Sequence, residues 1–582
     1  STYVAFRGPS GWTTQGVMPT TRTEYLSVQL ASQFSADLSA AVVSSSYPVT
    51  ADTLANTGNF FRRDNTTGRF QLLSPRPNGV QGDGVANIFD GIGSADLTTY
   101  AFMAEHPLRD GDPEPVGGQG YLIYKHRIGG ELELVANNAN VGWGRAKETA
   151  MSADGSRLFY TSPGINGDQY SQGSLYLSED GSPPIEVSAS QLPTPEPTHE
   201  VAQFVRATPD GSKVLFASTE RLNEESNADG GATVHNEDIG DLYVYDVESG
   251  SLRDISSSAP SGGRAMGVLG ASTDLSKVYF VDKAVLAPGG VEGSPNLYFW
   301  DSAAGVSFAG ALAAGDTTTW TGVVTERQSR VSADGSAVVF QSRAAIGGYD
   351  PDGHVGVYYY RGGGAAPVCI SCGPEGTAEA DAQLVDRFFA NAWNHQARFV
   401  SDDGRRAFFT SAGALVGRDT NGKLDAYQWD AEAGRLALIS SGQGESDSVF
   451  LDASPDGGNA FFSTRDRLVG GDADTLVDAY VARVGGGFPE PPFGPGACAG
   501  EGCKPSRSAP PPGAAPSSSS YFGPGSAKPR TRCAKPTRKR KAAKAKSKAR
   551  GKATRQRAHA RNQVKAKKKK QSQRKSCRGG RS

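Results

Sequence analysis

The sequence predicts an all-β protein, a β-propeller of about eight four-stranded blades, with seven blades as the alternative, followed by a disordered basic tail. An Asp-centred turn motif recurs eight times, and short β-rich runs follow the copies. The third observation is compositional: residues 527–582 hold 25 Lys and Arg but no Asp or Glu. Evenly repeated units of this kind are typical of propellers and related arrays. We therefore expect a propeller over residues 1–488, a linker rich in Pro, Gly and Ser over 489–526, and the tail over 527–582.

The turn motif reads Ser-Ala-Asp-Gly-Ser in its fullest copies, which begin at Ser152 and Ser332. Successive copies are 53 to 69 residues apart, and the aspartates that anchor them are Asp37, Asp96, Asp154, Asp210, Asp274, Asp334, Asp403 and Asp456. Asp-Gly favours a hairpin turn, because Gly adopts a positive φ without steric cost and Asp bonds the nearby backbone. Three copies replace Gly with Leu38, Leu97 or Leu275. There we expect a different turn, since Leu at a positive φ costs about 1 kcal/mol.

A second pair of β-rich runs follows the turn in most repeats, for example residues 241–246 and then 251–255. Together with the runs on either side of the turn, this pair gives the four strands of one propeller blade. The last repeat has a third run at 478–483 and then changes to Gly and Pro. We expect the first residues, Tyr3 to Thr14, to complete that blade and close the ring, since closure removes exposed sheet edges.

Two segments carry a resemblance to a known family. Ser454-Pro455-Asp456-Gly457 and Leu242-Tyr243-Val244-Tyr245-Asp246 resemble the WD40-like repeats of TolB-type β-propellers, over roughly residues 1–485. The family includes periplasmic partner-binding propellers, the propeller halves of prolyl peptidases, and a few lyases, so the resemblance implies the architecture and no single activity. The layout of propeller, Cys-containing linker and basic tail is similar to that of large secreted propeller proteins of high-GC actinobacteria.

We expect no enzyme here. No Gly-x-Ser-x-Gly elbow marks a hydrolase, and no two histidines have the spacing of a metal-ligand pair. The predicted function is a non-enzymatic binding or scaffold propeller of the cell envelope or extracellular space, with an unidentified protein or glycan on one face. The alternative is a propeller lyase or another carbohydrate-active enzyme. It would need three or more of six histidines to meet at the axial channel: His106, His126, His199, His235, His354 and His395.

Two loops suggest a calcium site. Both have the pattern Asp-x-Asp/Asn-x3-Asp, and their polar residues are Asp419, Asn421 and Asp425, then Asp472, Asp474 and Asp478. Alternate oxygen ligands on a tight loop suit a hard cation. The competing interpretation is an Asx-type turn that opens the third strand of a blade, and no other cofactor is expected. For the cysteines, the closely spaced pairs Cys369–Cys372 and Cys498–Cys503 predict two loop disulfides.

The net charge of −1 averages two unlike parts, since residues 1–526 hold 35 basic and all 61 acidic residues, a net of −26. The tail is expected to bind anionic polymers such as cell-wall polymers, lipid headgroups or DNA through counterion release. Its densest basic runs are Lys539, Arg540 and Lys541, then Lys567, Lys568, Lys569 and Lys570. No stretch of about 18 apolar residues predicts a transmembrane helix. We expect a secreted or envelope-bound monomer whose true N-terminus, with any signal peptide, precedes Ser1.

Overall fold

The computed structural model confirms the all-β fold class. It describes residues 2–8, 11–18, 31–45, 49–51, 53, 58–76, 88–115, 121–139, 149–162, 173–194, 202–226, 228, 239–257, 264–321, 327–384 and 396–487. Over these ranges the helical structure is almost nil, with one four-residue helix, α1 (Thr318–Thr321). No helix there is long and apolar enough to cross a membrane. Residues 488–582 lie outside the described residues, and they include the linker, the basic tail, Cys498, Cys503 and the seven predicted polyanion-binding residues.

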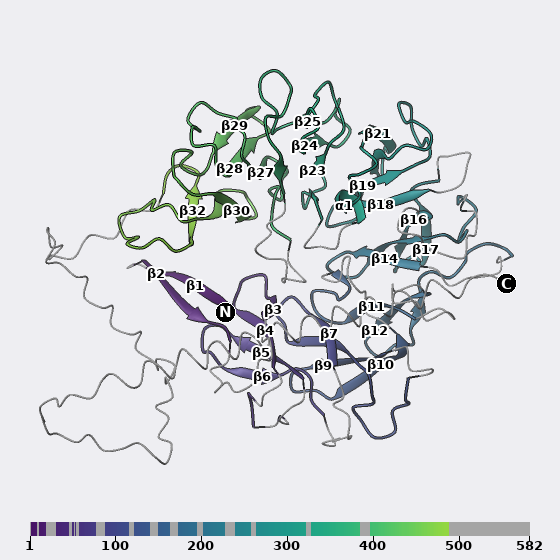
Figure 1. Ribbon diagram of the computed structural model, residues 1–582. Coiled ribbons are helices and arrows are strands. Elements are labelled where there is room, and N and C mark those ends of the chain that lie inside the picture. The colour runs from purple at the N-terminus through teal and green to yellow at the C-terminus, as the bar shows by residue number, and fades with distance from the viewer. Residues whose placement is uncertain are drawn as a thin grey trace, which may run out of the picture. The chain divides into compact units, whose positions relative to one another are not determined.

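The strands assemble into antiparallel sheets that follow one another along the chain (Figure 1). The first two strands form a hairpin, and we number the eight sheets that follow it blades 1 to 8. Blade 1 is β3 (Ala31–Phe34), β4 (Ala40–Ser45), β5 (Asn59–Asp64) and β6 (Phe70–Leu72). Blade 2 is β7 (Ile88–Gly93), β8 (Thr99–Ala104), β9 (Tyr121–Arg127) and β10 (Leu132–Ala139). Blade 3 is β11 (Arg157–Thr161), β12 (Leu175–Glu179) and β13 (Ile185–Glu186). Blade 4 is β14 (Ala202–Ala207), β15 (Lys213–Ser218), β16 (Asp241–Asp246) and β17 (Ser251–Asp254).

The second half of the propeller repeats this order. Blade 5 is β18 (Ala265–Ala271), β19 (Lys277–Asp282), β20 (Asn296–Asp301) and β21 (Gly305–Ala311). Blade 6 is β22 (Ser329–Val331), β23 (Ala337–Ser342), β24 (Gly356–Arg361) and β25 (Val368–Cys369). Blade 7 is β26 (Ala382–Gln383), β27 (Arg406–Ser411), β28 (Asp425–Asp430) and β29 (Arg435–Leu438). Blade 8 is β30 (Ser448–Ala453), β31 (Asn459–Thr464) and β32 (Asp478–Arg483).

The described sheets number eight after the hairpin, but two of them have three strands rather than the predicted four. In blade 3 the first strand is reduced to an isolated bridge between Met151 and Leu158. Blade 8 ends with its third strand, β32. In the other six sheets the strand order is sequential, each strand pairing with the next along the chain, as in a propeller blade.

The cores lie between consecutive blades. Strands such as β15 and β23 are buried along most of their length on both faces, because neighbouring sheets cover both sides, and their sequences are accordingly almost continuously apolar. One cluster joins Leu215 and Leu242 of blade 4 to Val278 and Phe280 of blade 5. Another joins Phe60 of blade 1 to the aromatic residues of blade 2. Burial on both faces therefore explains the β-rich runs that the sequence repeats.

The turn motif forms one hydrogen-bond network eight times. In every copy the Ser or Thr hydroxyl donates to the anchoring aspartate at 2.6 to 2.7 Å. The same carboxylate accepts the backbone N–H two residues later at 2.9 to 3.0 Å. These donors stabilise the ionised form, so the Ser152 hydroxyl lowers the pKa of Asp154 to about 2. The aspartates of the repeat thus stabilise turns.

The turns also join blades. Ala95 N donates to Ala153 O at 2.8 Å, and Asp402 N donates to Pro455 O at the same distance. The turn glycine faces the preceding blade closely: a Cβ on Gly155 would lie 2.6 Å from the Cβ of Thr99. Glycine is therefore required at this turn by the neighbouring blade as well as by its φ of 75°.

The prediction of a different turn in the three Leu copies is wrong. Leu38, Leu97 and Leu275 have φ values of 59°, 59° and 56°, which is the left-handed region that the turn glycines occupy. Leu97 and Leu275 are 0% and 2% exposed and belong to hydrophobic clusters shared with the preceding blade. Burial of a Leu side chain contributes about 2 kcal/mol, which offsets the backbone strain. Leu38 is half exposed, and nothing in the structure explains it.

The prediction that the first residues complete the last blade and close the ring is also wrong. Strands β1 (Tyr3–Gly8) and β2 (Gly11–Gly16) pair with each other as a separate two-stranded sheet, and among the described strands neither joins β30, β31 or β32. The hairpin instead packs on blade 1, where Val4 and Val17 contact Ala41 and Val43. The first residues thus cover a face of the first blade without supplying the fourth strand of the last one.

Replacing Ser332 with Ala is expected to lower the free energy of unfolding by about 1 to 2 kcal/mol. The Ser332 hydroxyl is buried, donates to Asp334, and accepts the Ala337 N–H at 3.0 Å, so its loss leaves the Ala337 N–H without this acceptor and removes one of the donors to Asp334. Urea unfolding followed by circular dichroism measures the change. The exposed Ser302 is the control, and Ser302→Ala is expected to stay within about 0.5 kcal/mol of the native protein. Equal losses in both variants would show that the turn network adds no stability.

Candidate functional site

The two predicted calcium loops occupy equivalent positions in blades 7 and 8. Each precedes the third strand of its blade, and Asp425 and Asp478 are the first residues of β28 and β32. The carboxylates of Asp472, Asp474 and Asp478 place oxygens within 4.8 Å of one another. Among the described residues, no other group of three or more His, Cys, Asp or Glu side chains comes this close.

The loop of blade 7 differs from that of blade 8 in burial. Asp419 is 4% exposed and Asp425 is fully buried. Burial raises the pKa of Asp425, and the charge of Asp419 raises it further. In blade 6 the loop at the equivalent position, residues 350–356, makes an Asx-type turn, in which Asp352 N donates to Asp350 at 3.0 Å. Gly356 stands where blade 7 has Asp425, so the blade 6 loop lacks the third acidic residue.

The structure joins Cys369 and Cys372 by a disulfide at the end of blade 6. Cys369 is the last residue of β25 and is buried, and it lies in the cluster that fills the space between blades 5 and 6. The bond closes a short loop over that core and leaves no free thiol at this position. It therefore indicates a structural role for this Cys-x2-Cys pair.

The three described histidines have separate partners. His106 lies 3.3 Å from Glu114, and His354 lies 3.4 Å from Asp381. His126 is buried, with Nδ1 3.1 Å from the carbonyl oxygen of Leu73, and burial lowers its pKa. His199, His235 and His395 lie outside the described residues. The described histidines therefore do not meet in the way that the lyase alternative requires.

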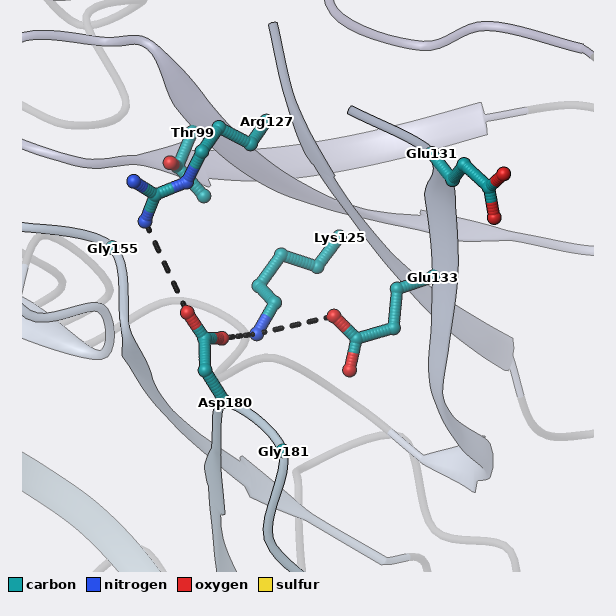
Figure 2. Close-up of a pocket in the computed structure, with 8 residues that line it drawn as sticks. All are labelled: Thr99, Lys125, Arg127, Glu131, Glu133, Gly155, Asp180 and Gly181. Atoms are coloured by element: carbon teal, nitrogen blue, oxygen red, sulfur yellow. Dashed lines mark hydrogen bonds and ion pairs between the residues drawn. The ribbon is translucent and has the colours of Figure 1, made fainter. Parts of the chain in front are cut away.

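A polar cavity of about 250 Å³ lies between blades 2 and 3. Figure 2 shows Lys125 at its centre, pointing toward Asp180 and Glu133. The Lys125 side chain is 5% exposed, hydrogen-bonds to Asp180, and lies 3.4 Å from Glu133. Arg127 adds an ion pair of 3.9 Å to Asp180. Because the cations face carboxylates of the same cluster, this network joins the two blades by pairing a buried ammonium group.

A pair of buried carboxyl groups in blade 4 was not anticipated from the sequence. Asp241 begins β16 and Asp254 ends β17, and they are 0% and 4% exposed. Ser226 and the backbone N–H of Ala228 donate to Asp241 at 2.7 and 3.0 Å. Burial and then the charge of Asp241 raise the pKa of Asp254 to about 9. Asp254 therefore carries a proton at neutral pH.

Comparison with protein-family models gives no match, and comparison with curated protein sequences gives none either. Several solved propellers are similar at low identity. An oligogalacturonate lyase from Vibrio parahaemolyticus is 10% identical over 83% of this chain and 96% of that chain, with a TM-score of 0.35. TolB from Acinetobacter baumannii is 14% identical over 52% of this chain and 57% of that chain, with a TM-score of 0.25. The β-propeller domain of the Trilobed protease from Pyrococcus furiosus is 11% identical over 70% of this chain and 98% of that chain, with a TM-score of 0.28.

The match to a prolyl endopeptidase spans 54% of that chain, so the chain covers little more than half of this peptidase and of TolB. These likenesses assign no activity. The repeated antiparallel blades and their shared turn network identify the chain as a β-propeller.

Proposed function

We propose that this chain is a non-enzymatic binding propeller of the cell envelope or extracellular space, held on an anionic cell-wall polymer by its basic tail. The observation that carries the proposal is the separation of charge. A body with a net charge of −26 precedes a 56-residue segment with 25 positive charges and no negative one. Such a segment binds polyanions by releasing their condensed counterions, whatever their sequence or fine structure.

The blades themselves support a binding rather than a catalytic role. All eight anchoring aspartates are engaged in turns, and the buried Lys125 is paired with carboxylates. The anchoring aspartates and Lys125 thus have structural partners. A protein or glycan bound to one face of a monomeric propeller would use the loops between strands, where propellers vary most.

Two features support an extracytoplasmic location and a TolB-type repeat. The Cys369–Cys372 disulfide suits an oxidising environment, where such bonds persist. The Ser-x-Asp turn, with its hydroxyl-to-carboxylate bond of 2.6 Å in Ser454 and Asp456, supports assignment of the repeats to the TolB-type WD40-like group. Membership of that group and secretion are both part of the proposal.

Retention of the full chain and of a version ending at residue 526 on immobilised wall polymer tests the function. The full chain is expected to bind at about 50 mM salt and to lose on the order of 10³-fold in affinity by about 200 mM, as several phosphate-like contacts would require. The truncated chain is expected not to bind. A matched variant with glutamine at Lys567, Lys568, Lys569 and Lys570 is expected to bind with a shallower salt dependence.

Equal retention of the full and truncated chains would overturn the proposal. Binding of the full chain to duplex DNA and to anionic lipid vesicles is measured in the same way. A clear preference for either of these over wall polymer, at equal charge and salt, would contradict the cell-wall assignment and point to that polyanion instead.

A further inference from the structure

Two buried carboxylates lie together in the loop that precedes β28. Asp419 and Asp425 are 4% and 0% exposed. One oxygen of each is already engaged: the Tyr427 hydroxyl hydrogen-bonds to Asp419 Oδ2, and the Ser440 hydroxyl donates to Asp425 Oδ1. Gly442 N also donates to Asp425 Oδ1, at 3.3 Å. Each carboxylate is therefore fixed in orientation by donors on one side only.

Within the described part of the chain, the other oxygen of each group has no hydrogen-bond partner. Asp419 Oδ1 and Asp425 Oδ2 are both buried, and neither receives a hydrogen bond. The two groups are close enough that the charge of Asp419 raises the pKa of Asp425. The Asn421 amide N–H faces Asp425 and lowers that pKa, although its Nδ2 completes no hydrogen bond of normal geometry. A buried carboxylate oxygen without a partner is costly, and two of them in one loop call for a cation.

The same position in other blades shows what an ion-free arrangement needs. Asn296 begins β20, as Asp425 begins β28, and its amide donates to the carbonyl oxygens of Val291 and Ser294 at 2.9 Å. It also accepts the Val291 N–H at 2.9 Å. Asp241 begins β16 and has donors on its Oδ2 from Ser226 and Ala228. Asp425 has neither the amide donors of Asn296 nor the second set of donors that satisfies Asp241.

The backbone holds the blade 7 loop in place. Asp419 N donates to Val416 O at 2.9 Å, and Thr420 N donates to Gly442 O at 2.8 Å. A Cβ on Gly442, whose φ is 66°, would lie 2.9 Å from the Cα of Asp419, so the two segments approach as closely as glycine allows. Asn421 Oδ1 accepts the Lys423 N–H at 2.9 Å, which closes an Asx-type turn. The ligand positions are therefore set before any ion arrives.

We propose that Asp419 and Asp425 bind a calcium ion, with water completing the oxygen coordination. Two carboxylates on a tight loop supply the charged oxygen ligands that a hard divalent cation prefers. The blade 8 loop has the same spacing and brings its three carboxylates within 4.8 Å, which shows that this loop shape gathers oxygens. The site is separate from the tail and adds a metal-dependent element to the proposed binding propeller.

Calcium titration of the full chain, followed by calorimetry and by thermal unfolding, tests the site. The native protein is expected to bind calcium and to unfold at a higher temperature with calcium than with EDTA. Asp425→Asn is expected to weaken this binding at least tenfold, as loss of a charged ligand does. In EDTA the same variant is expected to be more stable than the native protein, because asparagine removes the repulsion with Asp419. If Asp425 had only a structural role, Asp425→Asn would instead be less stable than the native protein in EDTA.

Terbium luminescence gives a local readout. Tyr427 contacts Asp419, so light absorbed by this tyrosine is expected to excite a terbium ion bound in the loop, and Asp419→Asn is expected to abolish that signal. Asp430→Asn is the matched control, since it removes the same charge at the other end of β28. It is expected to leave calcium affinity and luminescence unchanged.

Three outcomes would overturn the proposal. The first is calcium affinity in Asp425→Asn and Asp419→Asn equal to that of the native protein. The second is loss of all calcium binding in Asp478→Asn alone, which would move the site to blade 8. The third is an equal loss of calcium affinity in the Asp430→Asn control, which would show that the change in net charge alone causes the effect. The tail experiment is independent of all three, because the truncated chain keeps the loop.

Discussion

Replacing Gly240 with alanine is expected to lower the free energy of unfolding by about 4 kcal/mol or more, which is near the upper end for single substitutions. Gly240 has a φ of 81°, and a Cβ there would lie 2.2 Å from the carbonyl oxygen of Ser218 and 2.6 Å from the Cα of Thr219. Both obstacles are backbone atoms, which cannot move aside as a flexible side chain can. The strand end of β15 and the start of β16 would have to separate.

That separation would spread to the next blade. Gly240 O accepts the Ala265 N–H at 3.0 Å, and Ile239 N donates to Ala265 O at 2.7 Å. These two hydrogen bonds join the segment before β16 to the first strand of blade 5. Displacing Gly240 would strain both of them, so the junction between blades 4 and 5 would be weakened together with blade 4 itself.

Gly363 supplies the matched control for this prediction. Its φ of 72° is similar, but among the described residues no atom would lie within 4 Å of a Cβ at this position. Gly363→Ala is expected to cost about 1 kcal/mol, which is the backbone strain alone. Urea unfolding of both variants, followed by circular dichroism, measures the difference. Losses of the same size at the two positions would show that the contact with Ser218 and Thr219 does not limit the fold.

The turn and strand repeat could be predicted from the sequence because its causes are local. Asp154 and Gly155 favour the turn locally, and the apolar run that follows is buried on both faces in blades 1 to 7. The Leu turns could not be predicted in this way. Whether Leu97 tolerates a positive φ depends on its burial against the preceding blade, and that contact joins segments about 50 residues apart.

The candidate sites differ in the same way, since a site formed by residues close in sequence could be predicted and one formed by strand pairing could not. The candidate calcium loops were visible in the sequence, since their polar residues lie within seven residues of one another. The acidic pair in blade 4 was not, because Asp241 and Asp254 come together through strand pairing: Tyr243 is opposite Asp254, two residues beyond Asp241. An aspartate at the end of a strand indicates a turn cap in sequence. Only the packed sheet shows that both carboxyl groups are buried.

Substituting Asp254 with asparagine is expected to remove a large loss of stability that occurs as the pH rises from about 5 to about 8. The pKa of Asp254 is raised to about 9 in the folded chain by burial and by the charge of Asp241. In the unfolded chain a carboxyl group has a pKa of about 4. Between these values the folded state binds one more proton than the unfolded state, so the free energy of unfolding falls as pH rises. The fall ends once the folded form also loses its proton near pH 9.

The size of this effect follows from the proton difference. Over about three pH units between pH 5 and 8, the native protein is expected to lose about 2 to 4 kcal/mol relative to Asp254→Asn. Other titrating groups are common to both proteins and cancel in the comparison. Asp246→Asn in the same sheet is the control. The Ser249 N–H lowers the pKa of Asp246, so this control is expected to lose stability over the same pH range as the native protein.

A second variant separates burial from the charge of Asp241. If Asp241 contributes, Asp241→Asn should lower the pKa of Asp254, so that the loss of stability ends at a lower pH, because the repulsion is gone while burial remains. The double variant should show no loss in this range. Parallel pH profiles for the native protein and Asp254→Asn would contradict the buried pair. Since the asparagine amide can donate a hydrogen bond as the protonated carboxyl does, the variant keeps the polar contact and loses only the proton that titrates.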